Sequence, residues 1–235
     1  MLKLNSSKIL IIGIVVMVFL NCKSEKKEIH EQIKKVDTLS VINASDLTNT
    51  TNIAILDSFG IAIEGYNATR LGQAVYTGDT ATVGTLIKGG ASFAKCLTDE
   101  TYIYDILYAA LVFNKIDIVR YVLKNKLYKS INATYSEEAE TPLTLACGFK
   151  DSSDALEIAD TFISLGANVD GAGESGGEQT IFPLLVAVNQ NNVRLTKLLI
   201  ENHANRNIVN ENGISLLQIA QQKGFEGIVS LLNKN

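Results

Sequence analysis

Several residue types are scarce in this chain of 235 residues, and each shortage excludes a class of protein. The chain has no tryptophan and only two prolines, which argues against a disordered, proline-rich protein. Three cysteines are too few for a disulfide-stapled fold. The two histidines, His30 and His203, form no cysteine–histidine spacing typical of a zinc site. With 46% hydrophobic and 20% charged residues, the composition is that of an ordinary globular domain.

A surplus of positive charge is also missing. The net charge is -4, because 25 acidic residues outnumber 21 basic ones. Binding of nucleic acid requires a concentrated basic surface that neutralises phosphates. We therefore expect no nucleic-acid partner.

No combination of residues indicates catalysis. Acidic residues are scattered and form no pair at a fixed spacing. Cys147 directly follows Ala146 on an expected helix, which is more typical of a small buried residue than of a nucleophile. The glycine-rich stretch 171–177 lacks the Gly-Lys-Ser/Thr ending of a phosphate-binding loop. We expect no enzyme activity, no cofactor and no metal.

What the chain does have begins at its N-terminus. Lys3 and Lys8 precede an unbroken apolar run of 12 residues, Ile9 to Leu20. A helix of that length reaches about 18 Å, well short of the ~30 Å hydrocarbon core of a membrane. The pattern predicts a signal peptide over residues 1–21 rather than a transmembrane span.

The end of this run resembles the lipobox of bacterial lipoproteins. Phe19-Leu20-Asn21 leads directly to Cys22, although Asn21 is larger than the small residue that the family prefers there. The resemblance implies a lipid on Cys22 and a membrane anchor in the bacterial cell envelope, and Lys23 favours the outer membrane over the inner. The alternative is an ordinary cleaved signal followed by an incidental cysteine.

The next segments differ in composition. Residues 22–52 are polar and of mixed charge, which predicts a solvated tether between the lipid and a folded domain. Residues 53–67 carry apolar side chains, which predicts an N-terminal capping segment.

A repeated pattern covers residues 68–235. A leucine stands three residues before an alanine, and paired apolar residues follow about nine to thirteen positions later. The anchor alanines are Ala74, Ala110, Ala146, Ala187 and Ala220, at spacings of 36, 36, 41 and 33 residues. Each copy predicts a short helix, a turn and a second helix with apolar residues at helical spacing. One such unit cannot bury its apolar face alone, so the copies must stack.

The repeat resembles the ankyrin family, whose period is about 33 residues. Thr141-Pro142-Leu143-Thr144-Leu145-Ala146 stands where the family has its T-P-L-H-x-A signature, and Gly90-Ala91 and Gly166-Ala167 resemble its closing Gly-Ala. The resemblance implies an all-α ankyrin-repeat solenoid of about five repeats, joined by β-hairpin loops. It also implies a protein partner on the concave face.

When the concave face of the family is transferred to this sequence position by position, it predicts a partner-binding surface. Its residues are Tyr102, Tyr104, Val112, Phe113, Phe149, Asn189 and Gln190. The aromatic members are expected to be exposed, and exposed aromatic side chains make good interface anchors. The acidic residues Glu137, Glu138 and Glu140 beside them favour a partner with a basic rim. The alternative is that these aromatic rings cover the long loops around the second and third copies.

These features together predict a lipid-anchored, non-enzymatic protein-binding module, monomeric, in the bacterial cell envelope. Two other roles stay open, namely an immunity protein that neutralises a secreted effector and an accessory that holds a periplasmic enzyme near the membrane. Fold alone does not separate these roles.

Overall fold

The computed structural model describes residues 56–135, 139–173 and 181–233 of the chain, and these all fall within one compact unit, Ala44–Asn235. The predicted signal peptide, the lipidation site Cys22 and the tether lie outside the described residues. So do the first three residues of the predicted capping segment, together with Glu137 and Glu138.

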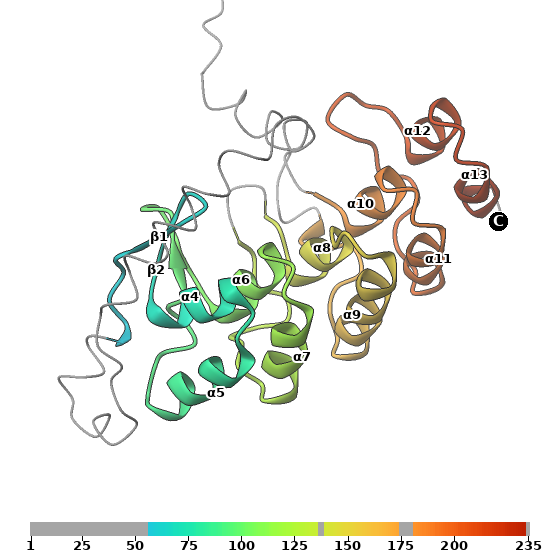
Figure 1. Cartoon of the computed structure of the whole chain (residues 1–235). Coiled ribbons are helices and arrows are strands. Elements are labelled where there is room, and N and C mark those ends of the chain that lie inside the picture. The colour runs from blue at the N-terminus through green and yellow to red at the C-terminus, as the bar shows by residue number, and fades with distance from the viewer. Residues whose placement is uncertain (1–55, 136–138, 174–180, 234–235) are drawn as a thin grey trace, which may run out of the picture. The chain divides into compact units, whose positions relative to one another are not determined.

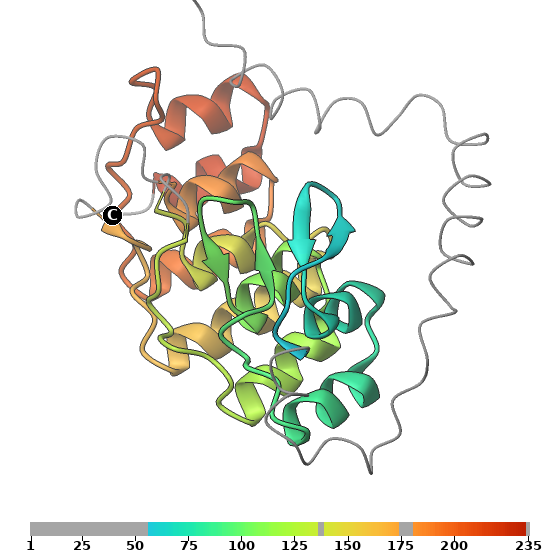
Figure 2. The same ribbon diagram turned by 90° about the vertical axis from the view of Figure 1, so that its left-hand side faces the viewer.

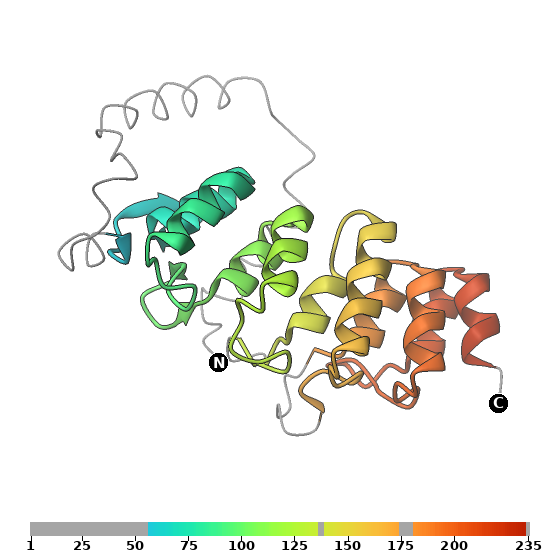
Figure 3. The ribbon, with the colours of Figure 1, turned by 90° about the horizontal axis from the view of Figure 1, so that it is seen from below.

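Ten helices occur in the described residues, and they follow one another in pairs. The pairs are α4 (Arg70–Thr77) with α5 (Thr80–Lys88), α6 (Ile106–Val112) with α7 (Ile116–Lys124), α8 (Pro142–Cys147) with α9 (Ser152–Ser164), α10 (Pro183–Asn189) with α11 (Val193–Glu201), and α12 (Leu216–Gln222) with α13 (Glu226–Leu232). The first helices pack in a row, α4 on α6, α6 on α8, α8 on α10 and α10 on α12. The second helices form a parallel layer beneath them (Figures 1 and 3).

Local residue choices explain where the first helices begin. Thr69, Asp105 and Thr141 each accept a hydrogen bond from the backbone N–H three residues ahead, and Ser215 completes a capping box with Gln218. Such N-caps satisfy backbone donors that the first turn leaves free. Helix α10 has no side-chain cap and begins instead with Pro183 at its first position.

The core lies between the two layers of helices. All five anchor alanines are at most 5% exposed, and the small side chain at this position lets neighbouring first helices approach closely. Aliphatic residues of the second helices, such as Val83, Val119 and Leu199, are completely buried against them. The buried residues form a cluster that runs from the first pair to the last.

A small antiparallel sheet precedes and joins the first two pairs. Its strands β1 (Ile61–Ile63), β2 (Tyr66–Ala68), β3 (Leu97–Thr98) and β4 (Ile103–Tyr104) lie in that order, as the neighbouring hairpins in Figure 2 show. Ala68 is paired with Leu97, and Leu97 with Tyr104. The helix-rich class expected from the sequence is confirmed, but "all-α" is incomplete because the β1–β2 hairpin gives β3 a partner strand.

Close packing holds this sheet against α4. A Cβ atom on Gly72 would lie 2.3 Å from the carbonyl oxygen of Cys96, just before β3. Only glycine allows the loop backbone to approach the helix at this point.

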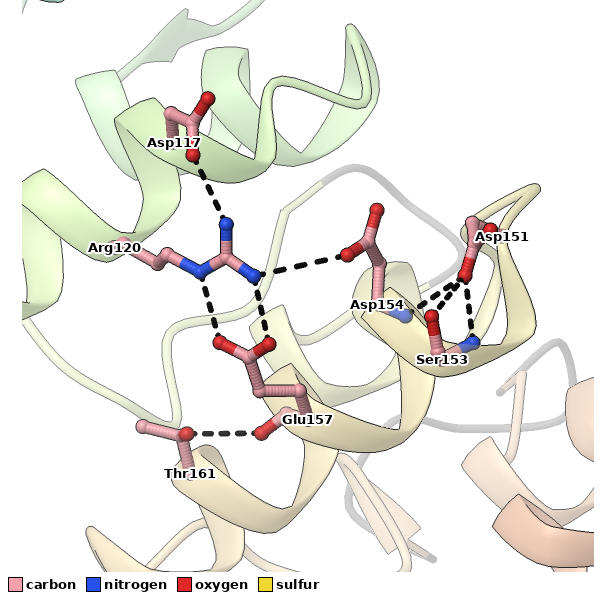
Figure 4. A network of polar contacts seen from close by, with 7 residues as sticks. All are labelled: Asp117, Arg120, Asp151, Ser153, Asp154, Glu157 and Thr161. Carbon is pink, nitrogen blue, oxygen red and sulfur yellow. Dashed lines mark hydrogen bonds and ion pairs between the residues drawn. The ribbon is translucent and has the colours of Figure 1, made fainter.

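The second helices of the second and third pairs are linked by an arginine (Figure 4). The Nε and Nη2 atoms of Arg120 on α7 donate to both carboxylate oxygens of Glu157 on α9, at 2.8 and 2.7 Å. Nη1 donates to Asp117 at 2.9 Å, and Asp154 lies 3.8 Å from Nη2. The hydrogen bonds from Arg120 lower the pKa of Glu157. This bidentate pair links the two helices at their exposed faces.

Candidate protein-binding surface

Aromatic side chains gather over the sheet and the first two helix pairs. We call the following seven residues the aromatic cluster: Tyr66, Tyr76, Tyr102, Tyr104, Tyr108, Phe113 and Tyr135. They include six of the eight tyrosines of the chain. The cluster draws on β2, the β3–β4 hairpin, the helices α4 and α6, and the start of the next hairpin.

Ring contacts connect the cluster around Tyr66. Its ring meets those of Tyr104, Tyr108 and Phe113 edge-on, with centroids 5.9, 6.4 and 6.1 Å away. Tyr104 and Tyr108 are stacked at 4.0 Å. Tyr76 reaches the other side of Phe113 at 5.0 Å. Edge-on and offset contacts are the favourable geometries for aromatic pairs.

Carboxylates accept hydrogen bonds from the hydroxyl groups of the cluster. Tyr104 donates to Asp99 at 2.6 Å, Tyr76 to Glu64 at 3.0 Å, and Tyr135 to Asp105 at 3.2 Å. The hydroxyls of Tyr66 and Tyr108 are bonded to each other at 3.1 Å. The rings are therefore oriented by polar contacts as well as by packing.

The electrostatic character of the cluster is negative. Burial raises the pKa of Tyr66, and the nearby charges of Asp99, Glu140 and Glu64 raise it further. Burial also raises the pKa of Asp105, against hydrogen bonds from the Tyr108 amide and the Tyr135 hydroxyl that lower it. A positively charged group is favoured beside such a surface.

The tip of the β3–β4 hairpin carries the most exposed part of this surface. Tyr102 is 39% exposed and Ile103 57% exposed. Tyr66, Tyr76 and Phe113 are half-buried beside them. These five side chains form the accessible apolar part of this surface.

The structure places the seven predicted residues in different environments. Tyr102 is exposed, and Val112 and Phe113 are half-buried. The expectation that Tyr104 and Phe149 are exposed is wrong, because they are only 4% and 3% exposed. Tyr104 is covered by its stack on Tyr108 and by Tyr66, and Phe149 packs into the hydrophobic core.

Four members of the cluster were missed at the sequence level, namely Tyr66, Tyr76, Tyr108 and Tyr135. Position within a repeat does not identify them, because Tyr66 precedes the first repeat and Tyr108 lies inside a buried helix. One signal was available. All eight tyrosines of the chain fall between residues 66 and 135.

The remaining predicted residues lie near the turns that join first and second helices. Phe149 and Gln190 line an open pocket of about 600 Å³ between the α8–α9 and α10–α11 turns, which we call the turn pocket. Asn189 lies outside it and accepts a hydrogen bond from the Lys223 ammonium at 3.0 Å. The predicted residues therefore do not form one surface, because some belong to the aromatic cluster, some line the turn pocket, and Val112 and Asn189 belong to neither.

Comparison with known proteins bears on the fourth helix pair. The family model for the ankyrin repeat matches residues 182–211. This stretch contains α10 and α11. The match supports an ankyrin-repeat protein, and ankyrin repeats generally mediate binding between proteins.

A plant protein is also similar in part. XBAT35 of Arabidopsis thaliana, whose name describes an E3 ubiquitin-protein ligase, is 33% identical over 98 residues. The similarity covers 42% of this chain, and the chain spans about a fifth of the length of XBAT35.

In residues 56–135, 139–173 and 181–233, no group of three histidine, cysteine or acidic side chains could hold a metal ion. Among the helices of these same ranges, none combines the length and apolarity needed to cross a membrane. The thiols of Cys96 and Cys147 are buried, and burial raises the pKa of both, which disfavours the reactive thiolate.

Proposed function

We propose that this chain is a non-enzymatic ankyrin-type module that holds a protein partner on the aromatic cluster. The observation that carries the proposal is the exposed pair Tyr102 and Ile103, set beside half-buried aromatic rings and rimmed by carboxylates. Large rigid rings lose little conformational entropy on binding, and they are common among residues that dominate interface energies.

The proposal extends the ankyrin unit to all five helix pairs. Three observations support this extension: the five anchor alanines recur in register, the pairs stack in two rows, and left-handed residues end the helices at related positions. Stacked repeats of this kind present an extended surface to which each repeat contributes a few side chains.

The chemistry of the surface favours a partner with lysine or arginine side chains. Glu64 and Asp99 already accept hydrogen bonds from tyrosine hydroxyls, so their charge lies at the hydroxyl ends of the rings. A cation placed over such a ring gains both the carboxylate attraction and a cation–π contact. Lys115 lies in this way over Tyr76, 5.6 Å from the ring centroid.

The location of the module in a bacterial cell envelope, anchored through a lipid on Cys22, is part of the proposal. Its support is the sequence of residues 1–22. In a bacterial host fed an alkyne-labelled palmitate, the wild-type chain should take up the label, and Cys22→Ser should lose it and leave the membrane fraction. Equal labelling of both forms would reject the anchor without affecting the binding surface.

A capture experiment tests the binding surface. The full chain in detergent is presented to envelope and secreted fractions as wild type, as Tyr102→Ala and as Leu165→Ala. Leu165 is 47% exposed but lies at the end of α9, so it is a matched control for loss of an exposed apolar side chain. A partner retained by wild type and Leu165→Ala but lost by Tyr102→Ala supports the proposal. Equal retention by all three forms rejects the aromatic cluster as the contact.

A further inference from the structure

The turn pocket has unpaired positive charge. Lys150 and Arg194 both line it, and neither side chain forms a hydrogen bond or ion pair with any residue that the structure describes. None of the nine lining residues is acidic. On its other side, Arg194 lines a second groove with Glu157 and Asp160 but makes no ion pair with either. This concentration of cations contrasts with the net charge of -4 of the chain.

A buried donor at the same pocket also lacks an acceptor. Asn192 lines the pocket, is only 6% exposed, and uses its Oδ1 atom to cap α11 by accepting from the Leu195 amide at 3.1 Å. Its Nδ2 atom has no hydrogen-bond partner. Buried donors are normally satisfied, so this region has donors in excess of acceptors.

Two helices begin at the pocket. Ser152 starts the 13-residue α9 and Val193 starts the nine-residue α11, and both residues line the pocket. The N-terminal end of α11, which is capped by the neutral Asn192, carries partial positive charge that adds to that of Lys150 and Arg194. The N-terminal end of α9 adds little, because the Asp151 carboxylate caps it and accepts from the amides of Ser153 and Asp154 through its Oδ1 atom (Figure 4).

We propose that the turn pocket is a second binding site, which takes an acidic peptide segment of a protein partner. Lys150 and Arg194 bind its carboxylates. The amide side chains of Gln190 and Asn191 offer hydrogen bonds to its backbone, and the 39%-exposed Val193 packs against its aliphatic groups. A pocket of about 600 Å³ is far larger than a single small anion needs, which favours a peptide over free phosphate.

This site is independent of the aromatic cluster. The two share no residue, and they attract opposite charges, because carboxylates rim the cluster and cations line the pocket. Loss of either site should leave the other intact.

Fluorescence anisotropy with the full chain in detergent tests the proposal. The probe is a fluorescein-labelled peptide of four glutamates between glycines, and the reference peptide has glutamine in place of glutamate. Wild type should bind the acidic probe, and the double variant Lys150→Gln/Arg194→Gln should bind it at least about tenfold more weakly, since each charged hydrogen bond is a substantial share of such an affinity. Lys197→Gln is the matched control, because Lys197 lies on α11 but does not line the pocket.

The control and a competitor give the outcomes that would overturn the proposal. Equal weakening by Lys197→Gln and by the double variant would show attraction to general positive charge, and equal binding of the glutamine peptide would show that carboxylates are not recognised. Inorganic phosphate that displaces the probe at a concentration below that of the unlabelled acidic peptide would make the pocket a phosphate site. Weak competition by phosphate, with loss of binding only in the pocket variants, supports the acidic peptide.

Discussion

Phe113 and Phe149 are 36 residues apart and follow the first helices of consecutive pairs, yet they serve different surfaces. Phe113 is half-buried, and its ring meets Tyr66 and Tyr76 in the aromatic cluster. Phe149 is 3% exposed and lines the turn pocket beside Lys150. The comparison teaches that the repeat sets the position of a side chain, whereas the side chains of neighbouring repeats decide its role.

The two regions also differ in their polar groups. In the aromatic cluster, tyrosine hydroxyls donate to Glu64, Asp99 and Asp105, so donors and acceptors are matched. In the turn pocket, Lys150, Arg194 and the Asn192 amide have no acceptor within the described part of the chain. One surface is preorganised by its own contacts, and the other leaves the side-chain cations of Lys150 and Arg194 without a partner in the described part of the chain.

Truncating the two phenylalanines should give the largest difference between the regions. Phe149→Ala is expected to lower the free energy of unfolding by about 3–5 kcal/mol, because it leaves a cavity in the core. Phe113→Ala should cost about half as much, since its ring is only partly buried. Urea denaturation followed by circular dichroism measures both losses. Equal losses would contradict the difference in burial.

The charge of Asp105 should make the stability of the aromatic region depend on pH. Burial raises the pKa of Asp105 in the folded chain, so its stabilising contribution is complete below the unfolded pKa of about 3.9 and is lost as pH rises through the folded pKa. Asp105→Asn retains the cap of α6 without the charge. The variant should therefore gain stability relative to wild type between pH 3.5 and pH 7.

Urea denaturation at both pH values checks this gain. Asp99→Asn provides a control for which the expected change in stability with pH has the opposite sign. Although burial acts to raise the pKa of Asp99, hydrogen bonds from Tyr104 and from backbone amides lower it overall. Its charged form is therefore stabilising, and the variant should lose stability relative to wild type as pH rises. A gain at pH 7 from both variants would reject the assignment for Asp105.

The smallest effect concerns the contact between the two regions. Arg120 on α7 joins the pair that carries Phe113 to α9 of the next pair. Because the arginine and its partners are largely exposed, Arg120→Ala should cost only about 0.5 kcal/mol. The loss should shrink in 1 M NaCl, where charges are screened within about 3 Å. Lys124→Ala, on the exposed end of the same helix, should have no comparable effect.

Much of the fold could be predicted from the sequence because its signals are local. The anchor alanines, the N-caps Thr69, Asp105 and Thr141, and the apolar residues of the second helices each depend on neighbours within a few positions. The small sheet was harder to foresee. Strands of two or three residues carry little pattern, and β3 is completed by a hairpin that precedes the first repeat.

The candidate sites show most clearly what the sequence determines and what the tertiary structure determines. By itself the sequence determined the five helix pairs, their spacing and the places of Tyr102, Phe113 and Gln190 within them, because periodicity and capping act along the chain. Only the tertiary structure decided that Tyr104 is covered by the edge-on ring of Tyr66 while Tyr102 is exposed, and that Lys150 and Arg194 meet at one pocket. These outcomes depend on side chains about 40 residues apart, whose contacts form only when the helix pairs stack.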